Sequence, residues 1–357
     1  MTRSRITMLT QYDGLRRQAF GRLRTATALV VAACAAAPAL ANDTSAELAT
    51  GGLIFVQNDN VEMRSEDLAI SAKEIAVRYR FFNKAASDVT VLVAFPMPDV
   101  RIEEPDQNIS LPTEDPVNLL AFTTAVNGKP VKTQVEQHVF AAGIDRTQLL
   151  MSLGIPLAPH LKATNDALDR LAREKWDDLI RIGLAEIEVY DVGKGRAKHL
   201  SARWSLRTTF YWEQTFPAKA ETLIEHRYRP SVGGSVQTSL GSPAAVKEAW
   251  YDDYKRKYCL DSDFFATIER LRKAAKSEFG PPYAEQRIDY ILRTGANWSG
   301  PIGQFHLTVD KGEAGSLVSF CGQSKKKTSD TKFEMTKTNF SPDGDLAVLI
   351  LKKMPSP

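Results

Sequence analysis

The chain of 357 residues contains 43% hydrophobic and 25% charged residues, which is typical of a globular protein and excludes a disordered or fibrous one. Its formal net charge of +3 comes from 46 Lys and Arg against 43 Asp and Glu. The first 41 residues hold six of the arginines and one aspartate, so residues 42–357 carry 40 basic and 42 acidic side chains, a net charge of −2. No basic stripe is left to neutralise phosphates, and nucleic acid is therefore not expected as a partner.

The N-terminal 41 residues have the three parts of a secretory signal peptide. A basic region precedes a charge-free run, Thr25–Ala41, which ends in Ala39-Leu40-Ala41. This A-x-A site predicts cleavage between Ala41 and Asn42, and hence a periplasmic or secreted protein. The run is shorter than the roughly 20 residues that a membrane-spanning helix needs, so no transmembrane segment is expected after signal removal.

Some details of export have alternatives. Val31-Ala32-Ala33-Cys34 resembles a lipoprotein cleavage box, which makes a lipidated Cys34 the minor alternative. Arg16-Arg17 leaves both Sec and twin-arginine export open. Met8 is a second candidate start of the chain.

Cysteine usage is consistent with an oxidising compartment. Two cysteines remain after signal removal, Cys259 and Cys321, and an even pair in an exported protein predicts a disulfide. The bridge would close a loop of 63 residues, for which chain entropy allows roughly 4 kcal/mol of stabilisation. Two buried free thiols are the alternative.

The stretch Glu74–Val100 has the clearest β pattern in the chain. Apolar residues alternate with polar ones before and after a short polar segment, at Ile75, Val77, Tyr79 and Phe81 and then at Val89, Val91, Val93 and Phe95. Period-two alternation is the signature of a sheet with one buried face. We therefore predict two strands joined as an antiparallel hairpin, which ends at Pro96 because proline cannot donate to a ladder.

Residues 42–140 as a whole are predicted to form an N-terminal β-sandwich part. At its start, Thr44-Ser45-Ala46-Glu47 fits a capping box and predicts a very short helix. Further on, Asn127-Gly128 between two apolar runs is the strongest short-range hairpin signal. Residues 101–118, rich in Pro, Asp and Glu, are expected to form a solvent loop.

Residues 141–198 have a helical period and are predicted to be a helical insertion. The spacing of Leu168, Leu171, Trp176 and Leu179 indicates one amphipathic helix that ends at Gly183, preceded by a shorter helix at 147–153. Alternation returns in residues 199–240, a predicted β-hairpin region that packs with the N-terminal sheet and has strands at 204–212 and 222–228.

The last two segments complete the fold class. Residues 241–280 are predicted as a helical pair, about 243–257 and 262–277, with Asp261 or Ser262 capping the second helix. Residues 281–357 are predicted as a C-terminal β part with strands at 284–292, 303–309, 317–321, 332–337 and 346–351. The fold is thus mainly β with helical insertions (α+β), built from antiparallel β-sandwich modules, expected to number two, with two helical segments.

Several stretches resemble one known family of exported bacterial proteins, domain of unknown function 4424. The resemblance is carried by the segments 63–68 (MRSEDL), 203–218 (RWSLRTTFYWEQTFPA), 226–233 (HRYRPSVG) and 294–302 (TGANWSGPI). It extends over essentially the whole chain after the signal. It implies an exported β-rich protein and brings no catalytic residue with it.

No catalytic or metal-binding motif stands out in the sequence. The five histidines, His138, His160, His199, His226 and His306, lack metal-ligand spacing. G-x-S-x-G, Walker and G-x-G-x-x-G motifs are absent. We therefore assign no catalytic residue, metal site or cofactor, and favour a noncatalytic protein.

Aromatic residues are the most suggestive candidates for a binding surface. Tyr211 faces away from its strand neighbours Phe210 and Trp212, and Trp298 lies in a loop of Gly, Pro and Asn. Exposed aromatic side chains can bind a sugar, a peptide or a partner protein. Burial in the core is the competing interpretation and the favoured one for Trp298.

Two functions follow from these patterns. The first is a noncatalytic cell-envelope protein that binds or scaffolds, whose partner would be another envelope protein or a small polar ligand. The alternative is a periplasmic hydrolase or other enzyme with a site assembled from distant residues, for example His306 with Asp289 or Asp310.

Overall fold

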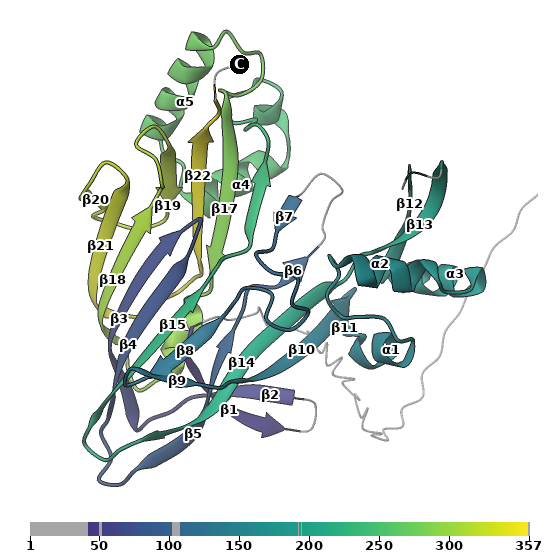
Figure 1. The fold of residues 1–357 in the computed structure, drawn as a ribbon. Coiled ribbons are helices and arrows are strands. Elements are labelled where there is room, and N and C mark those ends of the chain that lie inside the picture. Colours follow the sequence, from purple (N-terminus) through teal and green to yellow (C-terminus); the bar gives the residue numbers. More distant parts are fainter. Residues whose placement is uncertain (1–41, 50–51, 102–107, 192, 194, 356–357) are drawn as a thin grey trace, which may run out of the picture. The chain divides into compact units, whose positions relative to one another are not determined.

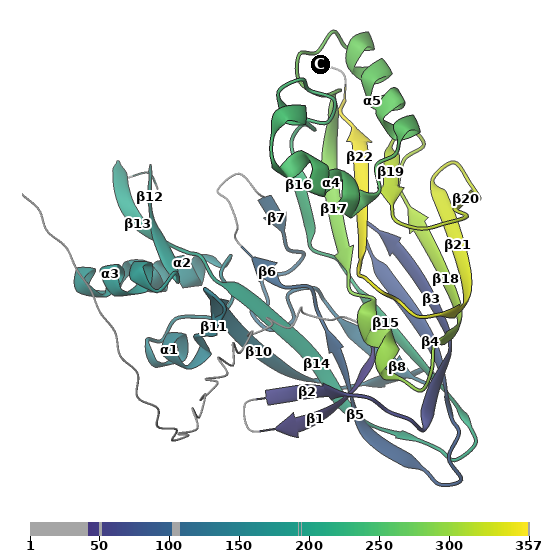
Figure 2. The ribbon, with the colours of Figure 1, turned by 180° about the vertical axis from the view of Figure 1, so that it is seen from behind.

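The computed structural model describes residues 42–355 apart from 50–51, 102–107, 192 and 194. The described strands form an eight-stranded, a seven-stranded, a five-stranded and a two-stranded sheet (Figures 1 and 2). The pairings within them are antiparallel except that of β18 (Ile302–Asp310) with β3 (Val61–Ser71), which is parallel. The predicted fold class, mainly β with helices between the strands, is confirmed. The signal peptide prediction lies outside the described residues.

The two largest sheets contain most of the N-terminal strands. The eight-stranded sheet has the order β20 (Lys326–Lys327), β21 (Lys332–Phe340), β18, β3, β4 (Ile75–Asn83), β15 (Glu221–Tyr228), β8 (Thr123–Val126) and β9 (Lys129–Val131). The seven-stranded sheet has the order β11 (Ile144–Asp145), β10 (Gln134–Ala141), β14 (Ser205–Phe216), β5 (Val89–Pro96), β1 (Thr44–Ala49) and β2 (Gly52–Val56), with β6 (Val100–Arg101) on β14.

The other two sheets are smaller, and most of the helices described pack beside them. The five-stranded sheet has the order β19 (Leu317–Phe320), β22 (Leu346–Lys353), β17 (Tyr283–Tyr290), β16 (Val232–Ser235) and β7 (Asn108–Ser110), and the two-stranded sheet pairs β12 (Ala185–Asp191) with β13 (Arg196–Ala202). The helices are α1 (Thr147–Ser152), α2 (Lys162–Asp169), α3 (Arg173–Arg181), α4 (Trp250–Tyr258) and α5 (Ser262–Ala274), with short 3₁₀ turns η1 (Ala245–Lys247) and η2 (Arg293–Asn297). Figure 1 shows α4 and α5 beside the five-stranded sheet and α2 beside β12 and β13.

The predicted hairpin of Glu74–Val100 is wrong in its pairing, although both strands form. β4 pairs with β3 and β15 in the eight-stranded sheet, whereas β5 pairs with β14 and β1 in the seven-stranded sheet. The second predicted hairpin has the same fault, because β14 and β15 also belong to different sheets. Each pair of consecutive strands therefore crosses from one layer of a sandwich to the other.

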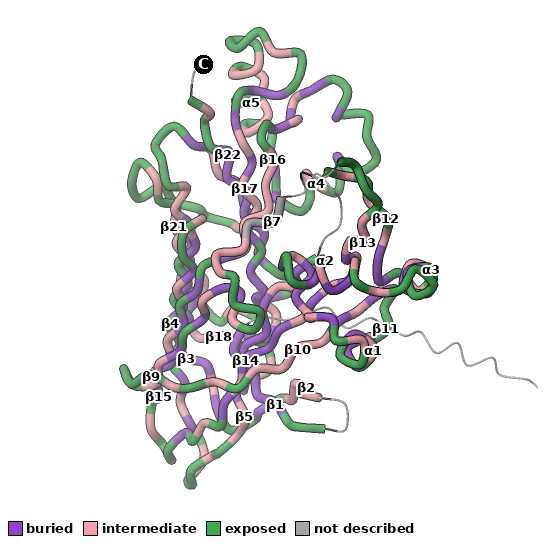
Figure 3. Tube along the Cα trace, turned by 45° about the vertical axis from the view of Figure 1, so that its right-hand side comes forward, coloured by how far each residue is buried: buried purple, intermediate pink, exposed green. Residues whose placement is uncertain are grey.

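Burial of aromatic side chains between the layers explains this crossing. The rings of Phe95 on β5 and His226 on β15 lie 4.7 Å apart, and those of Phe81 on β4 and Phe216 on β14 lie 5.6 Å apart. In a flat hairpin, the aromatic side chains of both strands would lie on one face of a single sheet. Two stacked sheets instead bury these side chains between the layers. Figure 3 shows the buried residues concentrated along these facing strands.

Asn83 connects the two loops in which the chain crosses between the sheets. It lies at the start of the short polar segment between the two predicted strands, yet its side chain is fully buried and donates to the carbonyl oxygens of Ser87 and Phe216, each at 2.9 Å. Its backbone N–H donates to Ala220 O at 3.2 Å. The loop after β4 and the loop after β14 are thus joined by the hydrogen bonds of a single residue.

The Asn-Gly hairpin is confirmed. β8 and β9 pair antiparallel with Val126 opposite Lys129. Asn127 and Gly128 both have positive φ angles, 49° and 75°, as a two-residue type I′ turn requires. The chain then leaves this sheet, because β10 pairs with β14 in the seven-stranded sheet.

The helix predictions have mixed outcomes. The short helix at residues 44–49 is wrong: this segment is the strand β1, whose pairing with both β2 and β5 replaces the local bonds of a helix. The predicted single helix before Gly183 is two helices, α2 and α3. The first ends where Asp169 accepts hydrogen bonds from Leu200 N (2.8 Å) and pairs with His199 Nδ1 (2.6 Å) on β13.

The C-terminal elements agree well with the prediction. Asp261 caps α5 by accepting from Phe264 N at 2.8 Å. The five predicted strands are β17, β18, β19, β21 and β22, although β18 and β21 extend the eight-stranded sheet rather than the five-stranded one. β18 and β21 belong to the eight-stranded sheet because β18 pairs in parallel with β3, a strand that is distant in sequence.

Candidate functional site

A charged cavity of about 730 Å³ opens between the five-stranded sheet, α4 and the segment that links β5 to β6. Pockets for small molecules span ~300–1,000 Å³, so this one is large enough for a metabolite. Its charged lining residues are Asp99, Arg101, Arg256, Lys257, Asp289, Arg293 and Asp345. We refer to it as the charged cavity.

The chain brings these residues together from segments far apart in sequence. Asp99 and Arg101 come from the end of β5 and from β6, where Pro96 and Pro98 stop the ladder. Asp289 is on β17, and Arg293 begins the 3₁₀ turn that follows it. Each segment is held by a sheet, so the cavity wall is built on rigid elements.

Ion pairs set the pattern of charge along the wall. Lys257 Nζ lies 3.1 Å from Asp289 Oδ2, and Arg293 Nη2 lies 3.0 Å from Asp345 Oδ2. Arg101 Nη2 lies 3.2 Å from Asp99 Oδ2. The lining thus presents opposite charges side by side, with four basic and three acidic groups. Such a lining suits a small polar ligand, above all one that carries an acidic group.

Tyr228 contributes an unpartnered polar atom to the cavity lining. Its side chain is 2% exposed, and its hydroxyl has no hydrogen-bond partner among the described residues. Burial raises the pKa of this hydroxyl far above its usual range, so it remains a neutral donor. A buried polar group without a partner costs roughly 1–3 kcal/mol.

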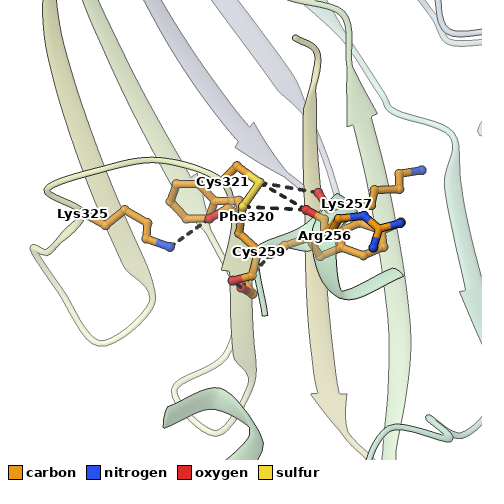
Figure 4. Close-up of a disulfide and its surroundings, with 8 residues drawn as sticks. Arg256, Lys257, Cys259, Phe320, Cys321 and Lys325 are labelled. Carbon is orange, nitrogen blue, oxygen red and sulfur yellow. Dashed lines mark hydrogen bonds between the residues drawn. A yellow bond between two sulfur atoms is a disulfide. The ribbon is translucent and has the colours of Figure 1, made fainter. Parts of the chain in front are cut away.

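The disulfide between Cys259 and Cys321 is present, with Cα atoms 5.1 Å apart. It ties the C-terminal end of α4 to the end of β19, and Cys321 itself lines the charged cavity. Figure 4 shows Arg256 and Lys257 beside the bridge, with Cys321 Sγ 3.7 Å from their carbonyl oxygens. The disulfide therefore fixes the part of α4 that supplies two of the basic groups.

A second group of polar residues, most of them titratable, is buried inside the sandwich. We call it the buried polar cluster, and its members are Asn42, Asp43, Glu66, Tyr79, His226 and Tyr290. Asp43 Oδ1 lies 2.9 Å from His226 Nε2, and neither side chain is exposed. Glu66 accepts from Asn42 Nδ2 at 3.1 Å. Burial raises the pKa of Glu66 to about 8.

The two aromatic candidates occupy different places. Trp298 is fully buried, and its indole N–H donates to Asp43 O at 2.7 Å, while its ring lies 4.6 Å from that of Phe81. It is part of the core, as the favoured interpretation had it, and cannot offer a binding surface. Tyr211 is half-buried and donates its hydroxyl to Gln134 Oε1 at 3.0 Å. A binding surface at Tyr211 stays a prediction.

The residues suggested for an assembled enzyme site do not come together. His306 Nδ1 lies 3.0 Å from Asp67 Oδ1 on β3, with Glu334 on its other side. Asp289 lies in the five-stranded sheet and pairs with Lys257. Asp310 accepts from Gly312 N in the turn after β18.

Among the residues that the structure describes, no group of three or more His, Cys, Asp or Glu side chains is arranged to hold a metal ion. None of the helices described is both long and apolar enough to cross a membrane.

The charged cavity had only partial signals in the sequence. The sequence indicates Asp289 only as a partner of His306 in an assembled enzyme site. It indicates Cys321 only as one half of a disulfide. Arg293 and Asp345 are 52 residues apart, and nothing local marks them as neighbours. Only the pairing of β17 with β22, which sets Tyr290 opposite Leu346, brings them to one place.

Comparison with known proteins identifies the family. The model of the family "Domain of unknown function (DUF4424)" matches residues 41–349, so the chain belongs to this family and the predicted resemblance is confirmed. No protein with a curated description matches the chain.

Among solved structures, the chain is similar to the crystal structure of a candidate nutrient-binding protein from Legionella pneumophila. The sequence identity is 17% and the TM-score is 0.44, over 87% of this chain and 70% of the other. At this level of similarity no function is transferred.

Proposed function

We propose that this protein is an exported, noncatalytic binding protein of the cell envelope that holds a small polar ligand in the charged cavity. The observation that carries the proposal is a cavity of about 730 Å³ whose lining gathers four basic and three acidic side chains. A few charged and polar groups that converge in a pocket of this size are typical of a small-molecule site.

The charges of the wall support a ligand with an acidic group. Arg293 uses its Nε and Nη2 atoms for Asp345, which leaves Nη1 without a protein hydrogen bond among the described residues. A guanidinium presents five donors in a rigid fork and binds carboxylate and phosphate well. The neighbouring carboxylates Asp289 and Asp345 would accept donors on the same ligand, such as amino or hydroxyl groups.

Export is part of the proposal and is supported by the N-terminal sequence. The basic region, the apolar run and the Ala39-Leu40-Ala41 site predict cleavage before Asn42, with lipidation of Cys34 as the alternative. The disulfide between Cys259 and Cys321 fits an oxidising compartment. Fractionation of cells with intact-mass measurement of the envelope form would test both parts of this prediction.

A thermal-shift titration tests the binding function. The mature protein is heated with a panel of small carboxylates, phosphate esters, amino acids and uncharged sugars, each at millimolar concentration. A ligand present at 100 times its Kd stabilises the folded state by ~2.7 kcal/mol. We expect at least one acidic compound to raise the melting temperature and Arg293→Gln to abolish the rise.

A matched variant controls for changes of surface charge. Lys255 lies on α4, like Arg256 and Lys257, but pairs with Asp252 and does not line the cavity. Lys255→Gln should leave the shift intact. If uncharged sugars shift the melting temperature and acidic compounds do not, or if both variants respond alike, the proposed ligand class is wrong.

A further inference from the structure

The buried polar cluster has more acidic than basic groups. Its two carboxyl groups, Asp43 and Glu66, face a single basic side chain, His226, which pairs with Asp43. No Lys, Arg or His in the described part of the chain pairs with Glu66, whose polar contacts are Asn42 Nδ2 at 3.1 Å and Tyr290 Oη at 3.5 Å. In addition, Asp43 Oδ2 is buried and lacks a hydrogen-bond partner in the regions described.

Asn42 is held inside this cluster from several directions. Its side-chain Oδ1 accepts from the N–H of Asp43 at 3.0 Å and from the hydroxyl of Tyr79. Its carbonyl oxygen accepts from Thr294 Oγ1 at 2.8 Å. Asn42 has no exposed surface. The residue that would begin the chain after cleavage is therefore a fixed part of the core.

The turn η2 and Trp298 form a clamp over residues 42–44. Besides the bond from Thr294, Asn297 Nδ2 donates to Thr44 Oγ1 at 2.8 Å and Trp298 Nε1 donates to Asp43 O at 2.7 Å. A Cβ atom at Gly295 would come within 2.7 Å of Asn42 Nδ2, so only glycine fits there without displacement. Residues 294–298 thus bind the start of the predicted mature chain.

We infer that removal of the residues before Asn42 places the new α-ammonium group of Asn42 in the buried polar cluster, where it compensates the charge of Asp43 and Glu66. Hydrolysis breaks the Ala41–Asn42 peptide bond, the water oxygen stays on the Ala41 carboxylate, and the released amine takes up a proton. The inference depends on the predicted cleavage site and is independent of the ligand.

The surroundings of the group favour the ammonium form. The titratable side chains of the buried polar cluster are Asp43 just before β1, Glu66 on β3, Tyr79 on β4, His226 on β15 and Tyr290 on β17. A free α-amine has a pKa of about 7.7–8.0, and a nearby carboxylate favours its charged form. Asp43 Oδ2, in the next residue, supplies an acceptor that the described residues leave unused. Processing would thereby convert an acidic cluster into a balanced one.

A double-mutant cycle separates the charge from the space that extra residues need. Four proteins are compared: the chain that begins at Asn42 and the chain with one alanine added before it, each with Glu66 and with Glu66→Gln. We expect the added alanine to lower the melting temperature by about 5 °C or more in the Glu66 protein and by less than half as much in Glu66→Gln. An equal penalty in both backgrounds would overturn the inference, because the effect would then be steric.

Chemical labelling of the α-amine gives a second readout that does not need the extended chain. The native protein beginning at Asn42 is treated at pH 7.5 with an amine-acylating reagent, and the N-terminal peptide is quantified against the same protein in denaturant. A buried, paired ammonium predicts labelling at least tenfold slower in the native state. Equal rates would contradict the inference, as would a mature protein whose measured mass shows that it begins at Cys34 or at another residue.

Discussion

The buried polar cluster and the charged cavity contain the same kinds of side chain in opposite settings. In the cluster, Asp43 and His226 pair with no exposed surface. In the cavity, Lys257 and Asp289 pair at a similar distance while both side chains remain about half exposed, at 48% and 49%. Charge in the cluster is withdrawn from solvent, whereas charge in the cavity remains accessible to a small molecule. The difference teaches that solvent access, and not residue type, separates the two settings.

The largest expected effect comes from breaking the buried pair. His226→Ala removes the basic side chain that pairs with Asp43 in the core, and removal of one partner of a buried pair costs about 3–5 kcal/mol. Urea unfolding should show this loss. The matched control is His306→Ala, since His306 also pairs with an aspartate but is 39% exposed, and exposed pairs contribute about 0–1 kcal/mol. Comparable losses in the two variants would remove the distinction between cluster and cavity.

The pH dependence of Glu66 should come next in size. In a chain that retains residues before Asn42, burial raises the pKa of Glu66 from 4.5 to about 8. The folded state then keeps a proton that the unfolded state releases, so the free energy of unfolding decreases as pH rises from about 4.5 to 8, by on the order of 4 kcal/mol. Glu66→Gln should flatten the decrease in stability over this range, which urea titrations at several pH values would measure. A slope that is unchanged in the variant would assign the effect to another group.

Loss of the disulfide should affect stability and binding together. Cys259→Ser combined with Cys321→Ser releases a loop whose ends are 62 residues apart, and the expected cost is about 2–4 kcal/mol. Because the bridge holds the end of α4 at the cavity, ligand affinity should fall as well. Unfolding and ligand titration of the double variant measure both effects. A normal affinity in a destabilised protein would show that α4 keeps its place without the bridge.

The smallest effect on stability is expected in the cavity itself. Arg293→Gln breaks an exposed ion pair, so the free energy of unfolding should change by less than about 1 kcal/mol. Tyr228→Phe removes a hydroxyl that has no protein partner, and the free energy of unfolding should stay constant or increase. Arg293→Gln should also lose ligand affinity, as isothermal titration would show. A large loss of stability in Tyr228→Phe would mean that its hydroxyl is satisfied inside the protein.

The sequence could predict features that depend on neighbouring residues, but not features that depend on contacts between distant residues. The Asn127-Gly128 turn is specified by the conformational preferences of two residues, and the predicted hairpin is confirmed. The crossing after Asn83 depends on contacts with Phe216 and Ala220, far along the chain, so alternation alone predicted strands correctly and their pairing wrongly. A pattern of period two reports which face is buried and carries no information on which strand lies beside it.

The candidate site was less predictable than the strands for the same reason. The pairing of Cys259 with Cys321 could be predicted because only two cysteines follow the predicted signal peptide. Arg293, Asp345 and Tyr228 have no motif in common, and they meet only because β22 begins near the ends of β15 and β17. The sequence predicts that Trp298 lies in a loop and is a candidate for a binding surface. Its indole N–H instead donates to Asp43 O in the core, because the loop folds over the start of the described chain.

The central claim, that the charged cavity holds a small polar ligand, is tested most directly by native mass spectrometry. The mature protein is purified gently from its own cell envelope and measured under nondenaturing conditions beside Arg293→Gln and Lys255→Gln. We predict an added mass of a small acidic compound on the wild type and on Lys255→Gln, and its absence from Arg293→Gln. A wild-type protein that carries no added mass and gains none with any compound of the thermal-shift panel would contradict the account.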